Sequence, residues 1–193
     1  HPGLGFVRRP GEVEIRGEGE WQPRPSSGSV RKYIWGFEPS LWVDGDGDFV
    51  SGSLKTELIE VLWHDGSHFE VNADLHADRP LEDDEILDVT IPAGEYRWNR
   101  WAVQYRTPQT REFAMDGRLS TGGYYDGTMD AGSLGLHWKP SPSFNGKLRY
   151  SENRANRPTG SFLSRVESLE LDWAFSPDLS WQNLIQADNQ SGS

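Results

Sequence analysis

Apolar and polar residues alternate along most of this chain, which is the two-residue period of a β-strand with one apolar face. The clearest case is 168–176, where every odd position from Leu169 to Phe175 is apolar and the even positions include Glu170 and Asp172. The same alternation recurs in three further segments, 69–76, 101–106 and 134–139. Apolar residues seldom recur at the three-and-four spacing of an amphipathic helix. The pattern therefore predicts an all-β fold.

The spacing of such segments predicts about ten strands in an antiparallel up-and-down meander, within a single domain over 1–193. The predicted strands cover 11–22, 31–43, 49–64, 69–76, 101–106, 112–120, 134–139, 144–151, 168–176 and 180–188. Short turns that contain proline are predicted at 138–143 and 175–180, and longer polar loops at 79–93, 121–131 and 154–165. Brief turns at one rim and extended loops at the other are typical of an outer-membrane β-barrel.

The composition of the chain argues against several classes of function. The 193 residues carry 30 Asp and Glu against 19 Lys and Arg, a net charge of −11, which argues against nucleic acid as a partner. There is no cysteine, so disulfides, thiolate metal sites and a cysteine nucleophile are excluded. Only 35% of the residues are hydrophobic, yet 9 are tryptophan, which suits a sheet whose two faces meet different surroundings.

Two environments are compatible with the apolar face of such strands. In a soluble β-sandwich this face covers a protein core, whereas in a barrel that crosses a membrane it faces lipid and the polar face lines the lumen. Charged residues in mid-strand favour the barrel, because charges in a hydrated lumen cost little; examples are Glu170 with Asp172, and Lys147 with Arg149. Trp and Tyr near the predicted strand ends suit the aromatic girdles of the two membrane interfaces.

Six short phrases occur in one order along nearly the whole chain. They are GFVRR at 5–9, IPAGEY at 91–96, GGYYDG at 122–127, WKP at 138–140, YSEN at 150–153 and FSPDLS at 175–180, which leads into LIQ at 184–186. In these phrases the chain resembles an uncharacterised family of bacterial outer-membrane barrels that usually follows an N-terminal carbohydrate-binding family-nine-like domain. The resemblance implies a C-terminal part of a longer protein, located in the bacterial outer membrane. It implies no activity, and any hydrolase activity would reside outside this chain.

The segment 98–101 is the best recognition candidate, since tryptophan faces stack on sugar rings and arginine binds hydroxyls or carboxylates. The candidate ligand-binding residues are Trp98, Arg100 and Trp101. Odd and even positions of a strand face opposite ways, so Trp98 and Trp101 form one platform only if a bulge intervenes. Girdle or core positions are the competing interpretation of both tryptophans.

Asp44, Asp46 and Asp48 place three carboxylates at alternate positions, as in the first part of a calcium-binding loop. The twelfth position counted from Asp44 is Lys55, where a calcium loop requires a bidentate glutamate. An acidic hairpin turn is therefore the favoured interpretation, with weak Ca²⁺ binding as the alternative.

These patterns lead to one hypothesis and one rival. The hypothesis is a non-catalytic segment of an integral outer-membrane β-barrel, an open curved sheet as a fragment. It serves as channel, anchor or export scaffold for a periplasmic carbohydrate-binding-like domain, with outer-membrane lipid as its main partner and carbohydrate as a second. The rival is a soluble β-sandwich that binds carbohydrate or accompanies a glycoside hydrolase.

Overall fold

The computed structural model describes residues 12–86 and 89–189, so the GFVRR phrase at 5–9 and position 11 lie outside the described residues. All of the regular structure in these ranges is β-strand. The strands are β1 (Val13–Arg16), β2 (Gly19–Trp21), β3 (Val30–Val43), β4 (Phe49–Trp63), β5 (His68–Asp78), β6 (Asp84–Ile86), β7 (Val89–Ile91), β8 (Tyr96–Arg106), β9 (Phe113–Tyr124), β10 (Gly127–Ser141), β11 (Phe144–Arg157), β12 (Gly160–Ser176) and β13 (Leu179–Asp188).

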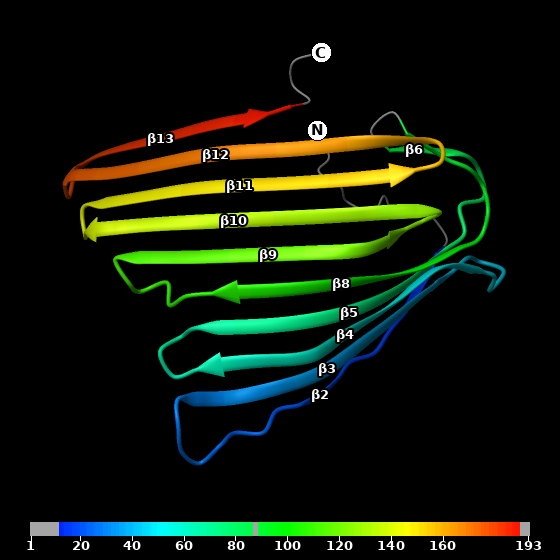
Figure 1. Ribbon diagram of the computed structural model, residues 1–193, viewed down its shortest axis with the longest axis horizontal. Helices are drawn as coiled ribbons and strands as arrows, with labels where there is room; N and C mark the ends of the chain where they lie inside the picture. The colour runs from blue at the N-terminus through cyan, green and yellow to red at the C-terminus, as the bar shows by residue number, and fades with distance from the viewer. Residues whose placement is uncertain (1–11, 87–88, 190–193) are drawn as a thin grey trace.

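One large antiparallel sheet contains all of these strands except β6 and β7. Its order is β1-β3-β4-β5-β8-β9-β10-β11-β12-β13, and the short strand β2 also pairs with β3 (Figure 1). From β3 to β5 and from β8 to β13 each strand pairs with the next one along the chain, as in a meander, while β5 pairs with β8 and both β1 and β2 pair with β3. Strands β1 and β13 form opposite edges and do not pair with each other, so the sheet is open. The prediction of an open all-β meander of about ten strands is thus confirmed.

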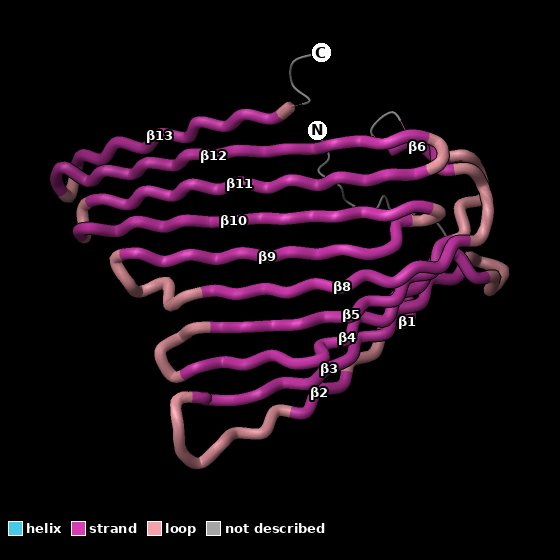
Figure 2. The backbone as a smooth tube through the Cα atoms, in the orientation of Figure 1, coloured by secondary structure: helices cyan, strands magenta, loops and turns pink. Residues whose placement is uncertain are grey.

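The strands bend across the sheet. In Figure 2 the strands β3 to β5 turn steeply at the end where β10 to β12 continue nearly straight. Several pairings also contain register shifts, as between Ile34 and Gly36 in β3 and between Glu57 and Ile59 in β4. Such irregularities increase the local twist of a strand. The described residues contain no helix long and apolar enough to cross a membrane.

Two of the three predicted long loops are wrong. Strands β9 and β10 continue through 121–131 and are joined by a tight turn at Tyr125 and Asp126, while β11 and β12 continue through 154–165 and turn at Pro158 and Thr159. Of the three predicted loops, only the connection between β5 and β8, which holds β6 and β7, is long. Polar, glycine-containing sequence suggested loops, but pairing with both neighbouring strands satisfies the backbone here and keeps it extended.

The turns form two rims. We call the rim with the turns at 64–67, 107–112, 142–143 and 177–178 the proline rim, since three of these turns contain proline. The other rim, with the connections 44–48, 79–95, 125–126 and 158–159, carries the two-stranded sheet β6–β7 and is called the hairpin rim. The proline rim lies at the left of Figure 1 and the hairpin rim at the right.

The two faces of the large sheet differ in chemistry and in exposure. In β8, Trp101, Val103 and Tyr105 share one face and are 50%, 44% and 41% exposed. On the other face Ala102 is 5% exposed, and Arg100 and Gln104 are partly covered. We call these the apolar face and the polar face. Cross-strand partners lie on the same face, so the registers extend both faces from strand to strand.

The hairpin β6–β7 lies against the polar face at the hairpin rim. Val89 and Ile91 of β7 are buried, and β7 contacts β12. Arg157, at the end of β11, donates from Nη1 to the carbonyl oxygen of Thr90 at 2.8 Å and from Nε to Asp126 Oδ1 at 2.7 Å. The hairpin therefore gives this end of the polar face a small core of its own.

No second large sheet covers the apolar face within the described residues. Trp173 and Phe175 of β12 are exposed, and Leu169 and Leu171 are only partly covered by their neighbours in the sheet. The described residues thus lack the two-layer core that a β-sandwich would place over these four side chains.

Candidate functional site

A continuous row of aromatic side chains crosses the apolar face near the proline rim. Ring centroids are 5.9 Å apart for Phe113 and Trp138, 5.4 Å for Trp138 and Phe144, and 5.4 Å for Phe144 and Trp173. Phe175 stacks on Trp173 at 5.6 Å, and Trp181 of β13 is the direct cross-strand partner of Trp173. The row, which we call the aromatic row, is Phe113, Trp138, Phe144, Trp173, Phe175 and Trp181. It spans the five strands β9 to β13.

Aliphatic side chains follow the aromatic row toward the middle of the sheet. Leu136 of β10 pairs with Leu148 of β11, Leu148 with Leu169 of β12, and Leu169 with Ile185 of β13. Because direct partners share a face, these four side chains form one apolar line across four strands. Three of them, Leu136, Leu148 and Ile185, are more than one-third exposed.

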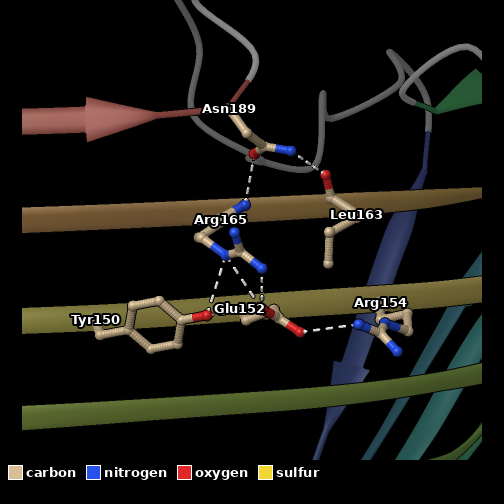
Figure 3. Close-up of polar contacts among 6 residues, drawn as sticks. All are labelled: Tyr150, Glu152, Arg154, Leu163, Arg165 and Asn189. Atoms are coloured by element: carbon tan, nitrogen blue, oxygen red, sulfur yellow. Dashed lines mark hydrogen bonds and ion pairs between the residues drawn. The ribbon is translucent and has the colours of Figure 1, made fainter.

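A charged cluster ends this apolar zone on the side of the hairpin rim (Figure 3). Tyr150 Oη donates to Glu152 Oε2 at 2.6 Å, and Arg165 Nη2 donates to the same oxygen at 2.9 Å. Arg154 Nη2 lies 3.5 Å from Glu152 Oε1, and Asn189 Oδ1 accepts the backbone N–H of Arg165 at 2.7 Å. These charged side chains lie on the apolar face, because the register pairs Glu152 with Arg165 on the side of Leu148 and Leu169. We call Tyr150, Glu152, Arg154 and Arg165 the charged border.

The aromatic row and the charged border enclose a zone of nearly constant length. Along β11, Phe144 to Glu152 spans nine residues (152 − 144 + 1), and along β12, Arg165 to Phe175 spans eleven (175 − 165 + 1). At about 3.3 Å per residue these stretches measure about 26 and 33 Å. Both strands continue beyond the charged border toward the hairpin rim.

The predicted ligand-binding residues divide between the two faces. β8 pairs with β5 without a register shift, so Trp98 and Arg100 lie on the polar face and Trp101 on the apolar face. The structure thus brings Trp98 and Arg100 together and leaves Trp101 away from both. Trp98 is also engaged by its neighbours, since its ring lies 5.4 Å from that of His76 and 4.7 Å from that of Tyr125.

The predicted calcium-loop residues lie in the turn between β3 and β4. Asp44 Oδ1 accepts the backbone N–H groups of Asp46 and Asp48 at 3.0 and 2.8 Å. Its carboxylate therefore shapes the turn in the manner of an Asx motif. Within the ranges that the structure describes, no three His, Asp or Glu side chains are grouped so that they could hold a metal ion.

The sequence did not predict the charged border, because its residues are separated along the chain and come together only in the folded sheet. Glu152 and Arg165 are 13 positions apart and meet only through the register of β11 and β12. The aromatic row depends in the same way on registers across five strands. Comparisons of the chain with protein-family models, with curated proteins and with solved structures found no match.

Proposed function

We propose that this chain is a non-catalytic segment of an integral outer-membrane β-barrel, whose apolar face contacts lipid and whose polar face lines a hydrated interior. One observation carries the proposal. In the middle of β8 to β10 large apolar side chains such as Trp101, Leu119 and Leu136 are exposed, whereas polar side chains between such positions, among them Gln104, Arg118 and His137, are partly or fully covered. A sheet with this distribution is suited to an apolar solvent outside and water within.

The energetics favour lipid over water on the apolar face. Among the described residues seven hydrophobic residues are buried, whereas 26 large hydrophobic side chains are exposed, and those on the apolar face include Trp101, Leu119, Leu136 and Leu148. Each large apolar side chain left in water forgoes about 1.5–3 kcal/mol relative to full burial. A native domain keeps only about 5–15 kcal/mol of net stability, so this surface needs an apolar partner.

The dimensions of the apolar zone agree with a membrane slab. A transmembrane β-strand uses about 9–11 residues, and the zone between the aromatic row and the charged border spans nine and eleven residues on β11 and β12. Aromatic girdles mark the two interfaces of such barrels. The aromatic row would lie at one interface, and the charged border with Tyr150 at the other.

The polar face has the character of a wet interior. It carries charged side chains from β4 to β12, among them Glu70, Arg118 and Lys147. Buried polar atoms on this face, including His68 Nδ1 and Asn72 Oδ1, have no hydrogen-bond partner within the described chain. Such atoms are costly in a dry interior and are satisfied by water.

The role of such a segment is structural. It forms part of the wall of a channel, an anchor or an export scaffold, and the resemblance to barrels that follow a carbohydrate-binding-like domain suggests the domain that it would serve. In this role the chain catalyses no reaction itself. Carbohydrate remains a candidate partner of the polar face.

Neighbouring positions of β12 give a direct test. Because the chain has no cysteine, Leu169→Cys and Ser168→Cys each create a unique labelling site, and the two side chains point to opposite faces. In phospholipid vesicles, a nitroxide at 169 should collide with dissolved oxygen, which concentrates in lipid. A nitroxide at 168 should collide instead with a water-soluble nickel chelate.

The pair also supplies its own control, since both labels lie at the same height in the same strand. Equal access of the nickel chelate to both positions would refute the proposal. So would protection of position 169 from both reagents, because that result would place a protein layer over the apolar face.

A further inference from the structure

A pocket on the polar face gathers three arginines. Its lining includes Arg106 at the end of β8, Arg118 of β9 and Arg149 of β11, and its volume is about 360 Å³. Small-molecule pockets measure about 300–1,000 Å³. The registers explain the grouping, because Arg106 pairs with Asp116, Asp116 with Gly135, and Gly135 with Arg149.

Gly135 provides the space in the middle of this row. A Cβ atom at this position would lie 2.7 Å from Asp116 Oδ1, which is closer than side chains normally approach. The Asp116 carboxylate takes this space, lying over Gly135, and it lines the pocket together with Arg149. We call this site, defined by Arg106, Arg118, Arg149 and Asp116, the arginine pocket.

The charge of the arginine pocket contrasts with that of the chain. The sequence has 11 more acidic than basic residues, so carboxylate partners are plentiful. Nevertheless, among the residues that the structure describes, none of the three arginines forms an ion pair; Arg118 Nη1 donates to Gln104 Oε1 at 3.3 Å. Asp116 is the one carboxylate residue in this lining, so the three guanidinium groups leave a surplus of positive charge that attracts an anionic ligand.

The other lining groups restrict the kind of anion. Gln104, Gln109 and Ser133 offer amide and hydroxyl groups that can bind hydroxyls. Asp116 lines the same pocket and bonds to His137 Nε2 at 3.1 Å, while its side chain stays 42% exposed. A carboxylate in this position penalises a dianion such as phosphate and can accept a hydrogen bond from a ligand hydroxyl.

We propose that the arginine pocket binds a small polyhydroxylated carboxylate, the chemistry of an acidic sugar. Its carboxylate bonds to the guanidinium forks of Arg118 and Arg149, where planar bidentate geometry is available. Its hydroxyls bond to Gln104, Ser133 and Asp116. The inference deepens the proposed function, because it assigns a ligand class to the polar face of the barrel wall.

Calorimetric titration of the full chain in a non-ionic detergent tests the assignment. The probes are galacturonate, the neutral sugar galactose and inorganic phosphate. Galacturonate should bind at least about tenfold more tightly than the other two, because each charge-assisted hydrogen bond is stronger than a neutral one. Arg118→Gln and Arg149→Gln should each weaken galacturonate binding about tenfold or more.

Arg97→Gln is the matched control, since it removes one positive charge from the opposite face of β8 and should leave the affinity unchanged. Circular dichroism confirms that each variant keeps its strands. Equal binding of phosphate or galactose, or galacturonate affinity that is the same in the Arg118 and Arg149 variants, would overturn the assignment. The nitroxide test at 168 and 169 reports on the membrane independently, so either proposal can fail without the other.

Discussion

Neighbouring side chains of one strand differ sharply in exposure, because they lie on opposite faces of the sheet. Within three consecutive residues of β8, Trp101 is half exposed, Ala102 is buried and Val103 is 44% exposed. The largest side chains thus lie where a water-soluble protein has its polar ones. The face on which each of these side chains lies follows from whether its position is odd or even, because successive residues of a strand point to opposite faces.

Tyr125 provides a prediction at this scale. It occupies the turn between β9 and β10 with φ of 53°, outside the apolar zone, and its hydroxyl donates to Asp78 Oδ2 at 2.9 Å. Burial, and then the adjacent Asp78 carboxylate, raise the pKa of Tyr125 above its ordinary value. A raised folded-state pKa stabilises the fold fully below the ordinary value, near 10, and this contribution is lost as pH rises through the raised value.

Tyr125→Phe should therefore make the free energy of unfolding less dependent on pH above about 10. Near neutral pH the variant should lose roughly 1 kcal/mol, since one hydrogen bond is removed. Urea unfolding of the protein in detergent, followed by tryptophan fluorescence from pH 7 to 11, measures both effects. If the free energy of unfolding of the variant fell with rising pH as steeply as that of the unsubstituted protein, Tyr125 would not be the group responsible.

At the scale of elements, the ten predicted segments account for all eleven strands of the large sheet, with 11–22 covering both β1 and β2, but their ends were not predicted. Near the hairpin rim, segments such as 121–131 and 154–165 are mostly polar or small, and their few large apolar residues, such as the adjacent Phe162 and Leu163, do not alternate with polar ones. Their extended form comes from backbone pairing with two neighbours, which depends on the register and not on local residue type. The arginine pocket was not predictable for the same reason, since Arg118 and Arg149 are 31 positions apart.

The hairpin β6–β7 was also missed, and Arg157 is one of the residues that hold it, beside Thr159, whose Oγ1 donates to the carbonyl oxygen of Thr90 at 2.9 Å. The Arg157 side chain is 1% exposed and joins Asp126 to the Thr90 carbonyl. Arg157→Gln should weaken the docking of the hairpin by about 1.5–3 kcal/mol, the usual worth of hydrogen bonds to charged groups. Hydrogen exchange at the amides of 89–91 should accelerate more than tenfold, while that of mid-strand β11 stays the same.

Arg154→Gln is the control on the same strand. Arg154 is exposed and pairs with Glu152 at 3.5 Å, so its loss should cost less than about 1 kcal/mol and leave the hairpin protected. If both variants exchanged alike at 89–91, Arg157 would not be one of the residues that dock the hairpin.

The whole molecule adds a constraint that no single strand supplies. A membrane interface is flat, so positions at one interface should share one depth even when several strands separate them. Phe113 of β9 and Phe175 of β12 lie at opposite parts of the aromatic row, whereas Leu148 and Leu169 lie in the aliphatic line between the row and the charged border. The position of each residue relative to the aromatic row should therefore determine its depth in the bilayer.

Single-cysteine variants at these four positions, labelled with a nitroxide in vesicles, should report two depths. Labels at 113 and 175 should lie close together and shallow, near the headgroups, because the aromatic row occupies an interface. Labels at 148 and 169 should both lie deeper, by the two or more residues that separate them from the row. Different depths for 113 and 175, or a row deeper than the leucines, would mean that the sheet as a whole does not cross the bilayer in the orientation that its side chains define.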